Sequence, residues 1–187
     1  TTPMLTTLEN GVKACPERSR RGGKWLSLMD KVYALATLQA AWQQVQSNKG
    51  SHGVDGVSVA RFAQRQEQYL QELQQALKEG SYQPLPVKRV FIPKAGGGER
   101  PLGIPAVKDR IVQTALKMVI EPIFENEFAE HSYGFRPQRG CKDALRIVDE
   151  GLKAGQTWVV DADMKSYFDS IPHAQLMAGV ETFISDG

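Results

Sequence analysis

Two carboxylates stand directly after a short apolar run, and both are placed to do chemistry. Asp161 and Asp163 follow Thr157–Val160, whose composition predicts a buried central strand with the acids at its exposed end. Mg²⁺ prefers oxygen ligands and usually takes one or two carboxylates plus substrate phosphates. Paired metal ions can stabilise the attacking and leaving oxygens of a phosphoryl transfer. Acids at strand ends are also common turn formers, so this motif alone leaves both interpretations open.

A second group consists of two cations on either side of a glycine-rich turn. Val87–Pro93 alternates in polarity and predicts a strand, Ala95–Glu99 predicts a flexible turn, and Arg100–Pro105 predicts the returning strand. An antiparallel return would bring Lys94 and Arg100 to one region. The mobile point charge of Lys and the planar fork of Arg suit a triphosphate. Two solvated charges beside an exposed turn are the alternative.

A third group alternates aromatic rings with arginines inside a loop rich in Gly and Pro. The loop runs from His131 to Gly140 and contains Tyr133, Phe135 and Arg136. Rings and guanidinium groups in such a loop can stack on bases and hold phosphates. The competing interpretation is that the two rings anchor an irregular loop in the core.

The remaining pattern predicts the helices that would position these groups. Apolar residues recur at helical spacing over five stretches: Trp25 to Val45, Val59–Lys78, Asp109–Ile120, Lys142–Lys153 and a last one from about His173. Ser58 is the expected N-cap of the second. Pro122 is expected to break the third before a shorter helix through Phe128.

Composition and charge limit the classes of protein that fit. No apolar run is long enough to cross a bilayer, and the first residues lack a signal-peptide pattern. Cys15 and Cys141 give neither a disulfide framework nor metal-ligand spacing, which favours a reducing, cytoplasmic setting. Basic residues gather between Pro86 and Lys117, whereas residues 143–187 are mainly acidic. This distribution suits a bound polyanion and bound cations, although ordinary surface scatter would also produce it.

In their order along the chain and in their residue sequences, these motifs resemble those of the reverse transcriptases and maturases of bacterial group II introns. The resemblance extends from about Lys24 to Gly187. It rests on four sequence segments: Asp55-Gly56-Val57, the Lys94–Pro105 hairpin, Ser132–Gly140 and Val159–His173. Several long motifs in the same order are far more specific than any one of them.

The resemblance implies an α+β fold, the N-terminal half of a right-hand polymerase. Residues 1–23 would be a flexible basic arm and residues 24–85 a helical N-terminal extension. Residues 86–155 would form the fingers, with the hairpin and further helices. Residues 156–187 would begin the palm with its first strand and first catalytic motif.

The resemblance also implies roles for individual residues. Asp163 would be the catalytic metal ligand, with the Met164 backbone carbonyl beside it, while Asp161 and Asp169 would be structural. Lys94 and Arg100 would grip the incoming triphosphate, and Phe168 would crowd a ribose 2′-hydroxyl. Template RNA would be contacted by three residues: Arg110, Tyr133 and Arg136.

The expected activity is RNA-directed DNA polymerisation with two Mg²⁺ ions. RNA template, DNA primer, deoxynucleotide triphosphates and group II intron RNA would be the partners, without a membrane. The family's Tyr-x-Asp-Asp motif does not occur in the sequence. We therefore expect that the remaining palm and the thumb are missing, and that the chain binds template and nucleotide without polymerising alone. The alternative is a non-catalytic RNA-binding module that assists intron splicing, and a palm-fold nucleotide cyclase ranks last.

Overall fold

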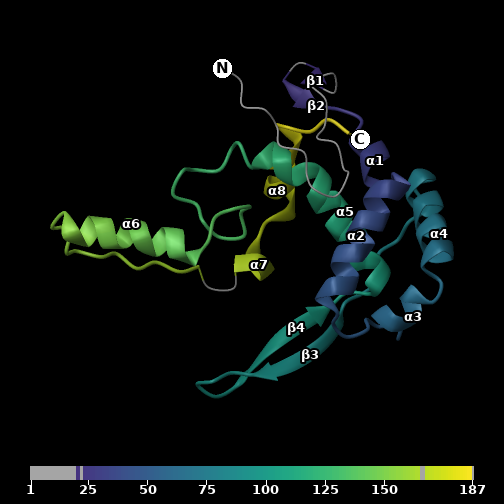
Figure 1. Ribbon diagram of the computed structural model, residues 1–187, viewed down its shortest axis with the longest axis horizontal. Helices are drawn as coiled ribbons and strands as arrows, with labels where there is room; N and C mark the ends of the chain where they lie inside the picture. The colour runs from purple at the N-terminus through teal and green to yellow at the C-terminus, as the bar shows by residue number, and fades with distance from the viewer. Residues whose placement is uncertain (1–19, 22, 165–166, 187) are drawn as a thin grey trace. The chain divides into compact units, whose positions relative to one another are not determined.

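The chain forms two compact units in the computed structural model, which describes residues 20–21, 23–164 and 167–186. Unit 1 is Thr1–Pro122 with Ser185–Gly187, and unit 2 is Ile123–Ile184. Helices and small antiparallel sheets make the fold a mixture of α and β, as predicted (Figure 1). The expected basic arm falls mostly outside the described residues. Its end forms strand β1 (Arg20–Arg21), which pairs with β2 (Lys24–Trp25), and the sequence did not predict this hairpin.

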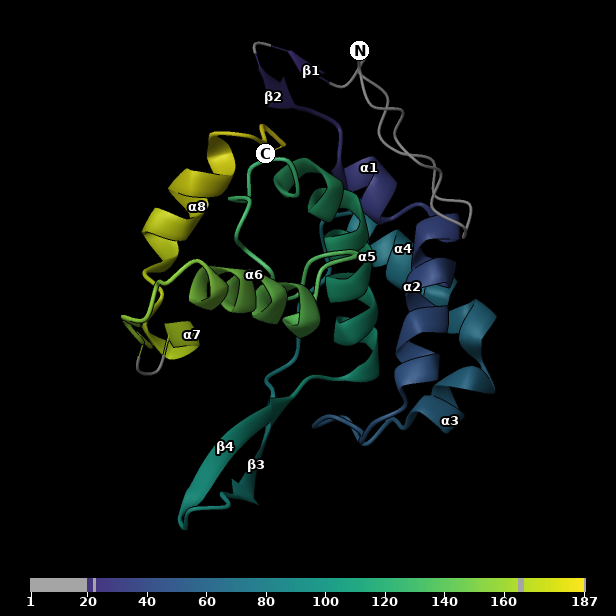
Figure 2. The ribbon, with the colours of Figure 1, turned by 60° about the vertical axis from the view of Figure 1, so that its left-hand side comes forward.

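Short helices pack around a small apolar core in unit 1. Those before the β3–β4 hairpin are α1 (Met29–Val32), α2 (Leu35–Asn48), α3 (Val59–Ala63) and α4 (Gln66–Lys78). Helices α2 and α4 lie side by side (Figure 2). Leu38, Ala41 and Trp42 of α2 are buried, as are Leu70 and Leu73 of α4. The predicted first helix is therefore present, but it starts later and is interrupted between α1 and α2.

The predicted helix over Val59–Lys78 is present in two pieces. Ser58 is its N-cap, as predicted, because its Oγ accepts a hydrogen bond from the Arg61 N–H at 3.1 Å. The break after α3 allows the rings of Phe62 and Tyr69 to approach to 4.9 Å between centroids. Residues seven apart in a continuous helix lie two turns apart, roughly 10.5 Å along the axis. The aromatic contact therefore requires the interruption that the periodicity did not reveal.

The predicted hairpin is confirmed. Strand β3 (Lys88–Pro93) pairs antiparallel with β4 (Glu99–Ile104), and inner and outer residues of β3 alternate in exposure. Gly97 and Gly98 have φ values of 90° and 78°, a conformation that favours glycine, and they close the turn. The hairpin extends away from the helices of unit 1 in Figure 1.

Helix α5 (Val107–Phe124) is longer than predicted. It continues through Pro122, so the expected break there is wrong. Proline has no N–H and removes one backbone hydrogen bond. The neighbouring apolar residues Val119 and Ile123 are both buried, which offsets that loss. The shorter helix expected through Phe128 is replaced by turns, with the Glu127 N–H donating to the Phe124 carbonyl at 2.9 Å.

In the described residues of unit 2, the loop from His131 to Gly140 is followed by α6 (Cys141–Lys153), α7 (Tyr167–Ser170) and α8 (His173–Glu181). The loop, α6 and α8 agree with the predictions. Helix α6 begins with two reciprocal hydrogen bonds. The Gly140 N–H donates to the Asp143 carboxylate at 3.0 Å, and the Asp143 N–H donates to the Gly140 carbonyl at 3.0 Å. Its apolar stripe is exposed, with Leu145 65% and Val148 55% accessible.

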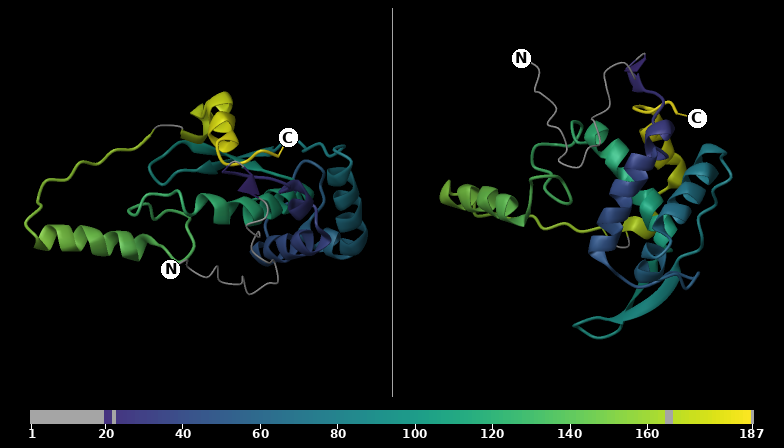
Figure 3. Two further views of the ribbon diagram at one scale, coloured as in Figure 1. Left: turned by 90° about the horizontal axis from the view of Figure 1, so that it is seen from above. Right: turned by 45° about the vertical axis from the view of Figure 1, so that its right-hand side comes forward.

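The predicted buried strand Thr157–Val160 is wrong. This segment is neither a strand nor buried, and Trp158 and Val160 are 97% and 94% exposed. Figure 3 shows it as an extended trace between α6 and α7. A central strand needs neighbours for its backbone N–H and C=O groups. The strands in the described residues pair only as β1–β2 and β3–β4, so this segment has no ladder to join.

Residues near the two ends of the described chain are joined in unit 1. The Ser185 N–H donates to the Trp25 carbonyl at 2.9 Å. The Asp186 carboxylate accepts hydrogen bonds from the backbone N–H groups of Ser27 (2.9 Å), Leu28 and Met29 (2.6 Å). These donors belong to the start of α1, where a carboxylate is favourable.

Two compositional features have a structural counterpart. Among the helices of the described residues, none combines the length and apolar character required to cross a membrane. Cys141 is an exposed free thiol, and Cys15 lies outside the described part of the chain.

Candidate nucleotide- and RNA-binding residues

The hairpin brings Lys94 and Arg100 to one face of its tip. Arg100 lies opposite Ile92 in the strand register, and the Lys94 N–H donates to the Gly98 carbonyl at 2.9 Å. Side chains alternate along strands, so Ile92, Lys94 and Arg100 share a face. Lys94 and Arg100 occupy diagonal positions, for which Cα atoms are roughly 7–8 Å apart. Both residues are exposed, so both charges are available to an anionic ligand.

The acidic residues predicted to hold metal lie in the extended segment between α6 and α7. Asp161, Asp163 and Met164 are all exposed. No group of three or more His, Cys, Asp or Glu residues within the described chain is close enough to hold a metal ion. The Asp163 carboxylate and the Met164 carbonyl suit Mg²⁺ in chemical type but provide only part of its ligands. The Asp169 side chain, predicted to be structural, lies outside the described part of the structure.

Phe168 is the predicted gate residue, and it lies in α7. Its side chain is 83% exposed. The ring contacts that of Tyr167, with 5.5 Å between the centroids and an interplanar angle of 58°. The aromatic surface of Phe168 is therefore accessible.

Arg136, predicted to contact RNA, is used inside unit 2. Its side chain is only 6% exposed and forms an ion pair with Glu125, at 2.7 Å between Nη2 and Oε1. The Arg136 Nε also donates to that oxygen at 2.9 Å. The remaining guanidinium hydrogen bonds go to the backbone carbonyls of Ala129 (2.9 Å), Ser132 (3.0 Å) and Glu125 (3.2 Å). Guanidinium carries five N–H donors, and these contacts occupy all of them.

Arg110, the second predicted RNA contact, donates hydrogen bonds to the loop that follows α2 (residues 49–56), which contains Gly50, Gly53 and Gly56 and is called the glycine-rich loop below. Its Nη1 donates to the Lys49 carbonyl at 3.3 Å, and its Nη2 donates to the Ser51 carbonyl. The same loop packs against the chain before α5, where a Cβ on Gly53 would lie 2.6 Å from the backbone of Ala106. Both arginines therefore have internal hydrogen bonds, and their contact with RNA stays a prediction.

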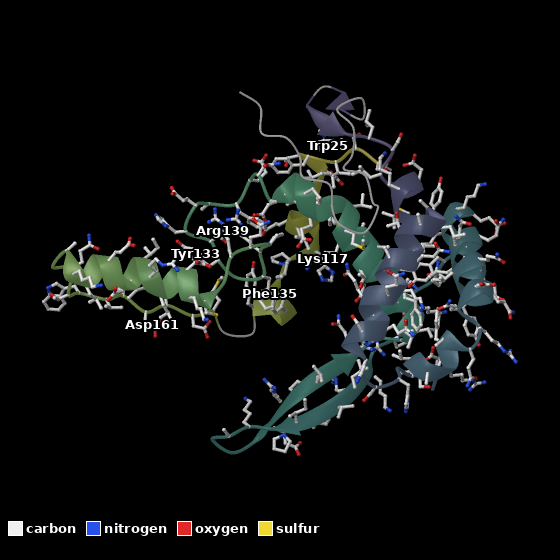
Figure 4. The ribbon with its side chains drawn as sticks, viewed as in Figure 1. Trp25, Lys117, Tyr133, Phe135, Arg139 and Asp161 are labelled. Carbon is white, nitrogen blue, oxygen red and sulfur yellow. The ribbon has the colours of Figure 1, made fainter. Side chains whose placement is uncertain are left out.

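The loop between α5 and α6 contains Tyr133, Phe135 and Arg139 (Figure 4). Tyr133 is half-buried, and the Arg139 guanidinium carbon lies 5.9 Å from its ring centroid, within the range of a cation–π contact. Phe135 is 100% exposed and has a φ of 56°. The loop thus contains one ring held by a cation and one ring in solvent.

Asp109 in α5 forms a polar clamp, a pair of hydrogen bonds to Tyr82 and Leu85, that the sequence did not predict. This residue is 3% exposed, and its carboxylate accepts hydrogen bonds from the Tyr82 hydroxyl at 2.5 Å and the Leu85 N–H at 3.1 Å. Burial, together with the hydrogen bond and the negative charge of Asp109, raises the pKa of Tyr82 above its ordinary value. The clamp fixes the segment that leads into β3. An acid in the first turn of a helix was the available signal, but it did not identify the partner.

An open groove of about 500 Å³ lies beside this clamp in unit 1. Its lining combines rings and apolar groups from α3 and α4 with Tyr82 and charged residues, including Asp55, Glu72 and Lys108. The mixture of charges gives the groove no single preferred ligand.

Comparison with known proteins places these residues in context. Residues 92–186 match the model of the family "Reverse transcriptase (RNA-dependent DNA polymerase)". The chain is 49% identical over 146 residues to protein YkfC of Escherichia coli, and the match covers 75% of this chain and 38% of YkfC. It is 37% identical over 149 residues to the group II intron-encoded protein LtrA of Lactococcus lactis, and this match covers 78% of the chain and 24% of LtrA. A shorter match, 39% identical over 64 residues, links 34% of the chain to 9% of nuclear intron maturase 2 of Arabidopsis thaliana. The chain therefore spans well under half the length of these relatives.

Proposed function

Because the chain belongs to the reverse transcriptase family, in its group II intron reverse transcriptase and maturase branch, we propose that it is the N-terminal part of an RNA-directed DNA polymerase. Its partners would be RNA template, DNA primer and deoxynucleotide triphosphates, and group II intron RNA, in a cytoplasmic setting. The observation that carries this proposal is the pair Lys94 and Arg100 on one face of the hairpin tip, within the matched residues.

The hairpin pair has the chemistry required for an incoming triphosphate. Arg100 presents a planar fork for phosphate oxygens, and Lys94 adds a mobile charge at the diagonal position. Neither residue is buried, so neither requires a permanent internal counter-ion. Phe168 would lie against the sugar and exclude a 2′-hydroxyl by steric conflict, which is a form of specificity that truncation relaxes.

Asp163 and the Met164 carbonyl would hold part of a Mg²⁺ site. When bound, the metal would stabilise the charge that develops on the transferring phosphoryl group. Two oxygen ligands from this segment do not complete a two-metal site, and the described residues offer no larger cluster. We therefore propose that the chain alone binds RNA and nucleotide but does not extend a primer.

In the proposed architecture, residues 24–85 are the N-terminal extension, residues 86–155 the fingers and residues 156–187 the start of the palm. Residues 92–186 match the reverse transcriptase family, which supports the last two assignments. Residues 1–23 would contribute a basic arm.

A non-catalytic RNA-binding module that assists splicing is the second candidate. The incomplete metal site favours it for this chain, and the exposed cations of the hairpin suit either function. The two candidates differ in their response to nucleotide. A polymerase fragment should bind deoxynucleotide triphosphates through Lys94 and Arg100, whereas a module specialised for RNA has no need of that site.

The test measures deoxynucleotide triphosphate affinity of the purified chain in Mg²⁺. Lys94→Ala and Arg100→Ala should each weaken binding by about tenfold or more, because each removes a charged contact of roughly 1.5–3 kcal/mol. Arg89→Ala is the matched control, since it removes an exposed cation from the other face of the same hairpin. Equal affinities for all four proteins would contradict the triphosphate site. RNA binding without any nucleotide binding would favour the splicing module.

A further inference from the structure

Phe135 combines two features that are unusual for a phenylalanine. Its side chain is 100% exposed, and its backbone has a φ of 56°. Bulky L-residues rarely adopt this left-handed conformation, and strain of this kind persists only where the surrounding structure fixes it. An exposed ring contributes nothing to the core. The burial of apolar surface therefore does not explain why the strained conformation is occupied by Phe.

Arg136, the next residue in the chain, holds the backbone conformation of Phe135 in place. Arg136 is buried, and its guanidinium connects Glu125 to the carbonyls of Ala129 and Ser132. Its guanidinium also lies over the Phe128 ring, 5.2 Å from the centroid. These contacts fix the backbone on the N-terminal side of the loop, while the Gly140–Asp143 hydrogen bonds fix its other end. With both sides anchored, the ring between them is directed into solvent.

We infer that Phe135 is a stacking platform for an unpaired base of single-stranded RNA, and that Arg136 positions it rather than binding phosphate. The inference rests on the proposed RNA-directed function. Every base has a π face, so an exposed ring of fixed orientation would bind a strand without strong sequence preference. Arg139 adds a positive charge to the same loop, where its guanidinium lies over the Tyr133 ring and donates to the Glu130 carbonyl.

The chemistry around Phe135 favours RNA over a protein partner. Between His131 and Gly140 the loop has arginines and no acidic residue. A protein interface is usually built on a contiguous apolar patch, and the residues next to Phe135 in the chain, Gly134 and Arg136, add no apolar side chain to it. A single accessible ring in a basic loop matches the pattern of aromatic and cationic groups that binds unpaired strands.

The experiment separates binding from folding at Phe135. Phe135→Gly should retain or raise the thermal unfolding midpoint, because glycine adopts a positive φ without strain. The same variant should weaken binding of a labelled, unstructured oligouridine RNA by about tenfold, the lower part of the range for losing one stacked base. Phe135→Leu should also weaken binding, and Phe135→Trp should preserve it. Trp158→Leu is the matched control, since Trp158 is another aromatic residue of unit 2 with 97% exposure.

Several results would overturn the inference. Unchanged RNA affinity in Phe135→Gly and Phe135→Leu would do so while leaving the proposed function intact, provided that the unaltered chain binds RNA. Equal losses in Phe135→Leu and Trp158→Leu would indicate general adhesion of exposed rings. A lower unfolding midpoint in Phe135→Gly would assign the ring a structural role. Reduced self-association in Phe135→Leu without a change in RNA affinity would identify a protein contact instead.

A double-mutant cycle tests the positioning role of Arg136. Arg136→Lys keeps the charge but cannot reproduce the five donors of the guanidinium. If Arg136 acts through Phe135, replacing Phe135 by Gly should change RNA affinity much less in the Arg136→Lys background than in the unaltered chain. Additive losses would mean that Arg136 contacts RNA independently, which contradicts this part of the inference.

Discussion

Removing Glu125 should destabilise unit 2, because this carboxylate neutralises the buried Arg136. Two of the five guanidinium hydrogen bonds go to its Oε1, at 2.7 and 2.9 Å. Losing one partner of a buried ion pair costs roughly 3–5 kcal/mol, since the other charge stays unpaired. The Glu125 side chain is 28% exposed, although its Oε2 is buried, and we expect a loss at the lower end of this range, about 3 kcal/mol, for Glu125→Ala. Glu125→Gln keeps an acceptor oxygen and should lose about half as much.

The assay is urea unfolding followed by circular dichroism, with hydrogen exchange of the amides between residues 123 and 140. Asp149→Ala is the matched control. Asp149 also pairs with a cation at short range, Lys153 at 2.6 Å, but the two side chains are 58% and 74% exposed. Exposed helix pairs contribute only about 0.3–0.5 kcal/mol. A loss below about 1 kcal/mol in Glu125→Ala, or one equal to that of Asp149→Ala, would show that the Glu125–Arg136 ion pair does not stabilise unit 2 as a buried pair should.

Three further predictions concern other residues. Tyr82→Phe should cost about 1–2 kcal/mol of unfolding free energy at neutral pH, because Asp109 loses a buried donor. The pKa of Tyr82 is raised in the folded chain, so its stabilising effect is full below the unfolded pKa of about 10 and declines above it. Unaltered protein should therefore lose stability above about pH 10 more steeply than Tyr82→Phe in pH-dependent urea unfolding, and parallel curves would argue against this linkage. Gly53→Ala should lower the unfolding midpoint, because the new Cβ would lie 2.6 Å from the Ala106 backbone, whereas Gly96→Ala has open space and should leave the midpoint nearly unchanged. In a longer, polymerising form of the protein, Phe168→Val should raise the ratio of ribonucleotide to deoxynucleotide incorporation, and an unaltered ratio in a folded variant would remove the gate role.

Local sequence signals predicted those elements whose stabilising contacts are also local. The Ser58 cap depends on a hydrogen bond to Arg61, three residues away, and the β3–β4 hairpin depends on a glycine turn between alternating strands. The amphipathic period of α6 likewise gave its length almost to the residue. In each case the residues that determine the structure are neighbours in the chain, so their pattern is visible without knowledge of the fold.

Predictions failed where the deciding contact lies elsewhere. Thr157–Val160 has the composition of a central strand, but a strand also requires partners, and apolar composition does not supply them. The helix break between α3 and α4 accompanies a contact between Phe62 and Tyr69, two rings that a continuous helix would hold two turns apart. Likewise, Pro122 remains helical because neighbouring side chains are buried. Periodicity reports the face of a helix but not the tertiary packing that interrupts or extends it.

Arg110 and Arg136 show that prediction of binding residues from sequence has the same limit. The resemblance to the family implies RNA contacts at Arg110 and Arg136, yet an arginine that binds a loop and one that binds a phosphate look identical in a motif. The two arginines differ in how many of their guanidinium donors are already occupied. All five N–H donors of Arg136 bond within the protein, whereas Arg110 makes one hydrogen bond from each terminal nitrogen, and its Nε is buried without a partner in the described structure. At Arg136 a phosphate would have to displace the Glu125 carboxylate or a backbone carbonyl that already accepts a hydrogen bond. For Arg136, whose donors are all occupied, this argument agrees with the proposal that RNA contacts the exposed ring of Phe135, which the arginine positions.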